Sequence, residues 1–427
     1  MEEKKFLEIL NKELVVSLGC TEPIAIAFAA ALARKHAKGN IVMKIKLNAS
    51  KNIIKNAMSV NIPGTHTCGI DLAAALGVIT QNPEKNLELL TDLKLKEVEN
   101  AKKMVQMNIV TVELADSVKK LYIEVFIQTE ISNSRVIIED KHDNVVMIEV
   151  DGKPLKNKEF NRDTKKDKYS TLEHDYLSLN SILEFIQNIN VEKLGLIKKS
   201  VDLNMEICLE GLKKPYGLGV GRSIKDNMEK GFLGDNTSNY AIALTAAGSD
   251  ARMAGSSLPV MSNSGSGNQG ISTTIPVVVF AEYFETCEEE LIRAVTLSNL
   301  VTIYIKLSLG RLSALCGASI SAAGACCGIM YLMGADESKI KLSIQNMIGN
   351  LTGMICDGAK AGCALKIATC TSAAIQSAIL TLEGNTLSSS DGIIGVTPEK
   401  TIENFCLIGN EGMIEADQLI LEIMLKK

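Results

Sequence analysis

Three cysteines in the last third of the chain, Cys316, Cys356 and Cys363, are the residues best suited to chemistry. Each lies among glycine and alanine in an apolar, nearly uncharged stretch, where small residues let the backbone pack closely around a bulky group that is not a side chain. Cysteine thiolates hold the irons of iron–sulfur clusters, and three thiolates leave one metal position open. We therefore predict a buried cluster site that a substrate can reach.

The other cysteines are predicted to serve packing. The chain contains eleven cysteines in all, and in a reducing compartment we expect no disulfide framework. Cys326 and Cys327 are adjacent, so their side chains diverge on a helix and do not share one metal. The remaining five without an evident partner are predicted to be small buried hydrophobic residues. These are Cys68, Cys208, Cys287, Cys370 and Cys406.

A zinc site is not favoured by the sequence. It contains no C-x-x-C pair and no H-E-x-x-H string, the usual spacings of zinc ligands. The four histidines are scattered at His36, His66, His142 and His174.

A glycine-rich loop matches the dinucleotide fingerprint G-x-G-x-x-G in the string GSGNQG, which ends at Gly270. That fingerprint needs a helix after it, and the β-branched run that follows is interrupted by Pro276, so we expect no phosphate-binding helix here. The loop is rich in backbone N–H groups and hydroxyls, which suits a carboxylate. We select Ser264, Gly265 and Asn268 as substrate contacts, with a plain turn as the alternative.

A pyridoxal phosphate enzyme is a coherent alternative, because this loop resembles the substrate-carboxylate loop of such lyases and Ser50-Lys51 resembles a Schiff-base lysine. In that fold the loop follows the lysine by a few tens of residues, whereas here more than two hundred residues separate them. We therefore expect no pyridoxal phosphate and interpret Lys51 as a surface or helix-start lysine.

Composition limits the remaining classes. The chain has 427 residues, of which 46% are hydrophobic, so it can bury a large core and favours two domains over one. A formal charge of -5 argues against a nucleic-acid partner. The acidic, amphipathic start MEEKKFLEIL is unlike a secretory signal, which favours the cytoplasm. Residues Leu312 to Ala335 carry no charge, but their glycines and serines and the lack of an aromatic belt indicate a buried helix pair and no membrane span.

The pattern of elements changes twice along the chain. Residues 1–150 are predicted to form an N-terminal lobe containing Cys20, several helices with a strand near 41–47 between them, and an antiparallel sheet with strands near 109–114, 121–128, 135–139 and 145–150. Residues 151–170 are predicted to be a charged linker, since eleven of the eighteen residues from Asp151 to Lys168 are charged. Residues 171–427 are predicted to be a helical, cluster-binding lobe. The fold class is therefore α+β, with a large mostly helical lobe and a smaller lobe that carries the sheet.

Five strings spread over the whole chain resemble a known family, the iron–sulfur L-cysteine desulfidases and L-serine dehydratase alpha chains, which includes a desulfidase-like bacterial group. The strings are GCTEP from Gly19, NIPGT from Asn61, SNSGSGNQG from Ser262, LCGASISAAGA from Leu315 and NLTGMICDGAKAGCALK from Asn350. They are long and distributed, which makes accidental similarity a poor explanation.

The resemblance implies a [4Fe-4S] cluster held by Cys316, Cys356 and Cys363, and a catalytic cysteine, thought to act as a base, at Cys20. Serine dehydratases of the family often end in a cysteine that reaches the cluster. This chain ends LEIMLKK, which favours the desulfidase branch.

Independent of that resemblance, Cys20 precedes a predicted helix from Pro23 to His36, where the helix dipole is expected to lower a thiol pKa. Glu22 in the same turn is interpreted as a helix-capping residue, with the proton carrier as its alternative role.

The sequence thus predicts an enzyme that eliminates hydrogen sulfide from L-cysteine and releases pyruvate and ammonia. Dehydration of L-serine by the same cluster is one alternative, and a redox or oxygen sensor without turnover is another. We expect a small amino acid as the only partner, with no nucleic acid and no membrane. Association of the chain into a homo-oligomer stays open.

Overall fold

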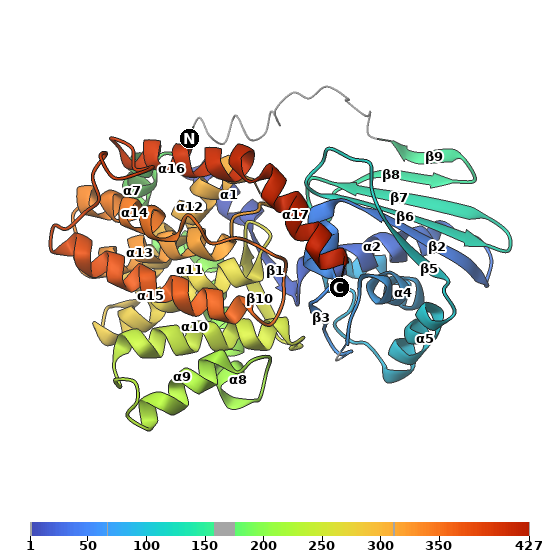
Figure 1. Ribbon diagram of the computed structural model, residues 1–427, viewed down its shortest axis with the longest axis horizontal. Coiled ribbons are helices and arrows are strands. Elements are labelled where there is room, and N and C mark those ends of the chain that lie inside the picture. The colour runs from blue at the N-terminus through green and yellow to red at the C-terminus, as the bar shows by residue number, and fades with distance from the viewer. Residues whose placement is uncertain (1, 66, 158–175, 311, 427) are drawn as a thin grey trace.

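The computed structural model describes residues 2–65, 67–157, 176–310 and 312–426, and it divides into two lobes that lie side by side (Figure 1). The smaller lobe carries a six-stranded sheet, and the larger lobe is built mainly of helices. The predicted α+β class is therefore confirmed.

The six strands are ordered β5-β2-β6-β7-β8-β9 across the sheet. Their bounds are β2 (Val42–Ala49), β5 (Val110–Leu114), β6 (Tyr122–Thr129), β7 (Asn133–Glu139), β8 (Val145–Val150) and β9 (Lys153–Asn157). Neighbouring strands are antiparallel except β2 and β5, which run parallel, so the sheet is mixed at one edge. A parallel pair needs a long crossover connection, which the helices between these two strands supply.

One face of the sheet is covered by helices α2 (Thr21–His36), α4 (Ile70–Thr80) and α5 (Leu95–Gln106) (Figure 1). Alternate residues of β6 are fully buried beneath them, because successive side chains of a strand point to opposite faces. The alanine-rich sequences of α2 and α4 let these two helices pack closely against each other and form the core of this lobe. Short elements complete the lobe: α3 (Lys51–Ala57), β3 (Asn61–Ile62), β4 (Thr67–Cys68) and the 3-10 helix Pro83–Glu88.

The helical lobe is centred on α12 (Glu288–Leu309) and α13 (Gly317–Leu332), which pack against each other. Around them lie α7 (Leu179–Asn188), α8 (Gly195–Lys213), α9 (Val220–Glu229), α10 (Thr237–Met253), α11 (Gly267–Tyr283), α14 (Glu337–Leu351), α15 (Cys363–Leu382) and α16 (Pro398–Leu407). Their buried residues form one continuous hydrophobic core.

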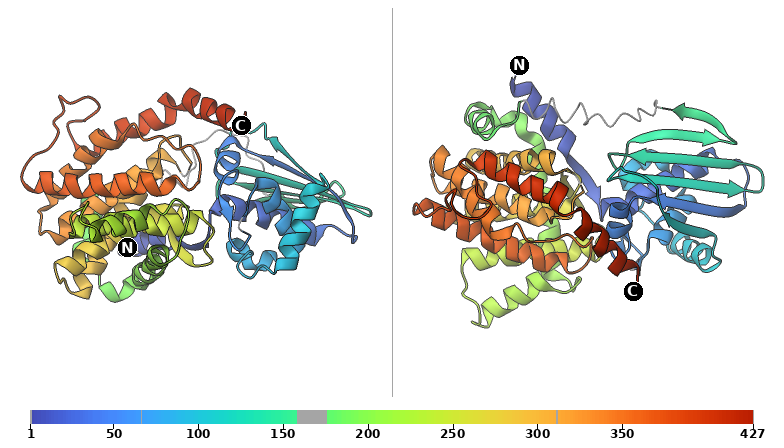
Figure 2. Two further views of the ribbon diagram at one scale, coloured as in Figure 1. Left: turned by 60° about the horizontal axis from the view of Figure 1, so that its bottom comes forward. Right: turned by 45° about the horizontal axis from the view of Figure 1, so that its top comes forward.

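The two ends of the chain pack into opposite lobes (Figure 2). Helix α1 (Glu2–Glu13) buries Phe6 and Leu10 in the core of the helical lobe, and β1 (Leu14–Leu18) pairs antiparallel with β10 (Pro259–Asn263). Helix α17 (Ile414–Leu425) buries Leu421 in the core of the sheet lobe. Each lobe therefore contains a segment from the far end of the sequence.

Several local expectations differ from the structure. Helix α11 begins within the GSGNQG string, where no helix was expected, and it continues through Pro276. The Ser266 hydroxyl caps its first turn, and burial of nearly all its residues stabilises β-branched side chains in a helix. Strand β10 precedes it, but the β1–β10 pair is antiparallel and unlike the parallel sheet of a dinucleotide-binding unit.

The cysteines outside the proposed site are mostly buried, as predicted. Cys208, Cys370 and Cys406 are buried, and so are Cys326 and Cys327. The prediction is wrong for Cys68 and Cys287, which are exposed because they lie at the edges of elements, in β4 and before α12. In the predicted linker, residues 153–157 form β9, and the part from 158 to 170 lies outside the described residues.

Two helices, α12 and α15, are long and apolar enough to cross a membrane by length and composition alone. The central stretches of these helices are 72% and 50% buried within the protein. The uncharged stretch of the sequence noted above contains α13, most of whose residues are buried in the core of the helical lobe.

Candidate active site between the lobes

Cys316 and Cys356 are brought together by a short pairing of two loops. Leu315 and Ile355 form an isolated antiparallel bridge, and each cysteine directly follows one of them. The backbone N–H of Cys316 donates a hydrogen bond of 2.9 Å to the carbonyl of Met354. Residues that flank a bridge pair point to the same side of the two strands. The two thiols therefore face a common side.

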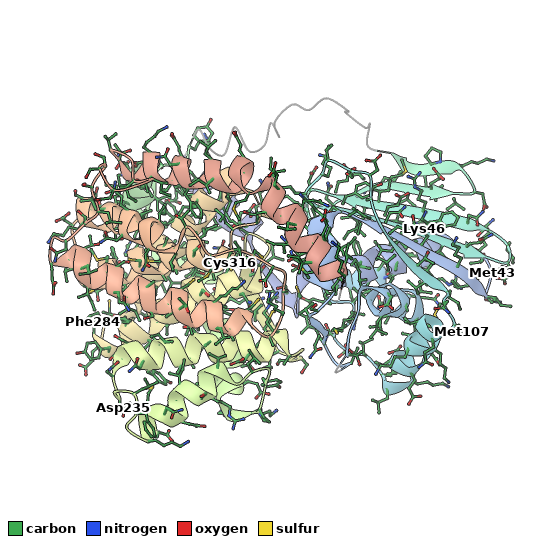
Figure 3. The ribbon with its side chains drawn as sticks, in the orientation of Figure 1. Met43, Lys46, Met107, Asp235, Phe284 and Cys316 are labelled. Atoms are coloured by element: carbon green, nitrogen blue, oxygen red, sulfur yellow. The ribbon has the colours of Figure 1, made fainter. Side chains whose placement is uncertain are left out.

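Cys363 joins this pair as the first residue of α15, seven residues after Cys356. The three cysteines and Cys20 line one cavity of about 120 Å³. Figure 3 places Cys316 near the middle of the molecule, on the part of the helical lobe that is closest to the sheet lobe.

The three thiols influence one another electrostatically. Burial, followed by the charges of Cys356 and Cys363, raises the pKa of Cys316 to about 12, and burial also raises the pKa of Cys363. The positive charge of Lys366 lowers the pKa of Cys316 and so offsets part of this rise. The Lys366 ammonium donates a hydrogen bond of 2.9 Å to the carbonyl of Ile355. Three thiolates in this cavity thus require further positive charge beside them.

The donor set fits a cluster better than one ion. Among the described residues, no three His, Cys, Asp or Glu side chains are close enough together to hold a single metal ion. Three thiols nevertheless line one cavity, together with the small residues Gly317, Gly358 and Ala359. In a cluster, thiolates bind different irons, so a wider spacing of sulfurs is compatible with it.

Cys20, at the start of α2, lines the same cavity and lies in a small hydrophobic cluster against which Ala359 and Cys363 pack. Its thiol donates a hydrogen bond of 2.9 Å to Glu22 Oε2. Burial and the negative charge of Glu22 raise the pKa of Cys20 well above its usual value, although Arg252 opposes them. The expectation that the helix N-terminus lowers this pKa is therefore wrong, because burial and an adjacent carboxylate outweigh the dipole.

Glu22 is held as a carboxylate by partners from two elements of the sheet lobe. Asn56 of α3 donates to Glu22 Oε1 over 3.0 Å, and His142 Nε2, in the turn between β7 and β8, lies 3.9 Å from the same oxygen. Burial alone would raise the pKa of Glu22, but His142 and the Cys20 thiol lower it to about 2. Thr21 adds a hydrogen bond of 3.2 Å to Oε2.

The loop between β10 and α11 forms another part of the lining. Ser264, Gly265 and Asn268 all line the cavity. The carbonyl of Gly265 accepts a hydrogen bond of 3.0 Å from Thr21, which ties this loop to the start of α2. Asn268 Oδ1 accepts one of 3.2 Å from Arg252.

The eight residues selected from the sequence for the site therefore line one cavity, although their roles stay predictions. Lys51 is not among the described residues that line it, and its ammonium instead pairs with Asp417 over 3.4 Å. Its place as the first residue of α3 agrees with a helix-start lysine.

The cavity residues that sequence reasoning missed include His142, Arg252 and Gln269. All three are buried, and each has a side-chain atom without a hydrogen-bond partner among the described residues, namely His142 Nε2, Arg252 Nε and Gln269 Oε1. Arg252 offered a signal, because it is a charged residue in a helix composed mostly of small and apolar residues. His142 offered none, since polar residues are common in a turn between strands.

The chain is similar to a known family of proteins. Residues 84–422 match the family model described as serine dehydratase alpha chain. Among curated relatives, the UPF0597 protein of Clostridium perfringens is 46% identical over 425 residues, which are 99% of this chain and 98% of the relative. The UPF0597 protein of Oleidesulfovibrio alaskensis is 43% identical over 427 residues, 100% of this chain and 99% of the relative. These names state no reaction.

Proposed function

Because the chain belongs to the serine dehydratase alpha chain family, whose members are lyase-type enzymes, we propose that it removes the β-substituent of a small amino acid. The proposed substrate is L-cysteine, and the products are pyruvate, ammonia and hydrogen sulfide. The proposed place of this reaction is the cytoplasm, where a reducing environment keeps the cysteines as thiols.

The observation that carries the proposal is the meeting of two groups of residues in one cavity. Three thiols, Cys316, Cys356 and Cys363, lie on its helical-lobe side, and the hydrogen-bonded pair Cys20 and Glu22 lies at the start of α2. A β-elimination needs electron withdrawal from the substrate and a base for its Cα proton. The first group suits the withdrawal, and the second suits proton transfer.

The three cysteines would hold a [4Fe-4S] cluster, which supplies, when bound, an iron that acts as a Lewis acid toward the substrate. Cys20 and Glu22 would move the proton. Because the pKa of Glu22 is lowered and that of Cys20 is raised, the resting pair is a carboxylate and a thiol, so Cys20 must first lose its proton to solvent before the thiolate can take the proton from Cα. The Cα–H electrons form the Cα–Cβ double bond as the Cβ–S bond breaks and HS⁻ leaves. The resulting aminoacrylate tautomerises and hydrolyses to pyruvate and ammonia.

L-Serine is the second candidate, because the matching family model carries the serine dehydratase description. Elimination of hydroxide in place of sulfide follows the same proton path. The preference for cysteine rests on the affinity of iron for thiolate.

Direct turnover of both amino acids by anaerobically reconstituted protein tests the proposal. We expect faster sulfide release from L-cysteine than pyruvate release from L-serine, and the opposite order would make the protein a serine dehydratase.

Cys20→Ser should keep the visible absorption of the cluster and lose at least about 100-fold in kcat, the contribution typical of a positioned acid or base. Cys326→Ser, a change of a buried cysteine that does not line the cavity, is the matched control and should stay active. A cluster signal without turnover of either amino acid would favour the sensor alternative.

A further inference from the structure

Two buried side chains in the cavity have polar atoms without partners, and the atoms are of opposite kinds. Arg252 is 3% exposed and Gln269 is 2% exposed. Arg252 Nε is a hydrogen-bond donor and Gln269 Oε1 is an acceptor, and neither has a partner among the described residues. A buried polar atom without a partner costs free energy unless a ligand or water satisfies it. The pair therefore points to a ligand that offers both an acceptor and a donor.

The orientation of the Gln269 amide follows from its hydrogen bond. Its Nε2 donates to the carbonyl of Asn263 over 3.0 Å. A backbone carbonyl only accepts hydrogen bonds, so the amide nitrogen must face Asn263 and the oxygen is the atom left over. The Arg252 guanidinium is fixed in a similar way by Asn268, which accepts from Nη1.

Two glycines make room for these side chains. A Cβ atom on Gly267 would lie 2.3 Å from Arg252 Nε, and a Cβ atom on Gly317 would lie 2.5 Å from Gln269 Oε1. Both distances are far below van der Waals contact, so any larger residue at either position would displace the polar group. The two glycines, each the first residue of a helix, thus leave the space that the side chains of Arg252 and Gln269 occupy in the lining of the cavity.

We propose that Arg252 binds the α-carboxylate of the substrate and that Gln269 Oε1 accepts a hydrogen bond from its α-ammonium group. This rests on the proposed function and assigns the amino-acid specificity of the same site. A guanidinium suits a carboxylate because its planar donors match the two oxygens. A carbonyl oxygen suits an ammonium, which only donates. The site thereby selects a zwitterion, and a 2-hydroxy acid or an amino-acid amide leaves one of the two groups unsatisfied.

Equilibrium binding of three small molecules of similar size tests this assignment without turnover. L-Alanine carries both charged groups and no leaving group, L-lactate lacks the ammonium, and L-alaninamide lacks the carboxylate. Titration calorimetry of the anaerobically reconstituted protein should show L-alanine binding roughly 10- to 100-fold more tightly than either analogue, the range typical of a hydrogen bond to a charged group.

Variants should separate the two contacts. Gln269→Met should weaken L-alanine by a similar factor and leave L-lactate unchanged, whereas Arg252→Met should weaken L-alanine and leave L-alaninamide unchanged. Gly317→Ala displaces Gln269 without removing it and should therefore affect binding as Gln269→Met does. Gly267→Ala displaces Arg252 without removing it and should affect binding as Arg252→Met does. The matched controls are Gln345→Met and Arg34→Met, because both residues are buried outside the cavity and make backbone contacts. Neither control should change the ratios between the affinities for L-alanine, L-lactate and L-alaninamide.

The outcomes distinguish this assignment from the reaction. If each variant weakens L-alanine but not the analogue that lacks the contacted group, and the protein eliminates neither cysteine nor serine, the zwitterion site is retained and the proposed function is overturned. If the protein turns over either amino acid but the variants do not show this pattern, the proposed function is retained and the zwitterion site is overturned. Failure of L-alanine to bind, or equal weakening of all three molecules by both variants, would overturn the assignment.

Discussion

Glu22 is a buried carboxylate whose charge depends on its neighbours. Its pKa of about 2 results from His142 and the Cys20 thiol, which outweigh the effect of burial. A carboxylate with a lowered pKa stabilises the folded protein at pH values above its ordinary pKa near 4.5, and this stabilisation is lost as the pH falls toward 2. The full contribution corresponds to about 3 kcal/mol.

Glu22→Gln should remove this pH dependence. Between pH 5 and pH 3, the free energy of unfolding of the unchanged protein should fall more steeply than that of the variant, as measured by urea unfolding at each pH. Glu184→Gln, a change of an exposed glutamate on α7, should keep the steep dependence. Parallel curves for Glu22→Gln and the unchanged protein would contradict the assignment of charge to this carboxylate.

Residue type explains which parts of the site could be predicted. Cys316, Cys356 and Cys363 could be selected because thiols among glycines suggest a cluster, and the structure brings them to one cavity. Arg252 and Gln269 could not, because a single arginine or glutamine has many ordinary roles. What distinguishes them is an unpartnered atom in a buried place, and burial depends on contacts between distant segments.

Helix α3 is the element that joins the C-terminus to the site. Lys55 is 1% exposed, and its ammonium pairs with Asp417 of α17 over 2.5 Å. The next residue, Asn56, donates to Glu22. Gly358, two residues after Cys356, lies against the carbonyl of Lys55, where a Cβ atom would be only 2.2 Å away. One short helix therefore contacts α17, the proton-transfer pair and the cysteine loop.

Asp417→Asn should destabilise the protein by roughly 3 to 5 kcal/mol, because it leaves the Lys55 ammonium buried without an anion. Urea unfolding at pH 7 measures the effect. Lys51→Met is the matched control, since the Lys51 side chain is 33% exposed and pairs with the same carboxylate at 3.4 Å, and its loss should cost about 1 kcal/mol or less. Replacing both buried partners, Lys55→Met with Asp417→Leu, should recover most of the stability. An Asp417→Asn protein as stable as the original would show that the pair is dispensable.

At the level of elements, prediction succeeded where the local pattern and the tertiary contacts agree. The predicted strand 145–150 is present as β8 with the same bounds. Prediction failed where contacts with a distant segment of the chain determine the local secondary structure. Residues 14–18 continue a helical pattern but form β1, because β10 pairs with them from far along the chain. Helix α11 formed despite β-branched residues and a proline, because it is buried on nearly all sides.

The two lobes exchange their chain ends, so we expect them to unfold together. Leu421 of α17 is 1% exposed in the core of the sheet lobe. Along the chain, however, α17 follows the helices of the helical lobe. Leu421→Ala should destabilise the protein by about 2 to 5 kcal/mol. Hydrogen exchange in increasing urea should then show β6 and α12 losing protection at the same, lowered concentration.

Leu419→Ala on the same helix is the matched control, because Leu419 is 57% exposed and its change should have little effect. Loss of protection in β6 alone after Leu421→Ala would show that the lobes are separate folding units.

The exchange of chain ends also matters during synthesis, because a ribosome releases the chain from its N-terminus onward. Strand β1 is synthesised long before its partner β10, and the apolar surface around α2 and α4 stays incomplete until α17 has left the exit tunnel. Incomplete cores of this kind expose apolar surface to aggregation. The protein therefore reaches its native packing only after α17 has been synthesised, and chaperones can bind the exposed apolar surface until then.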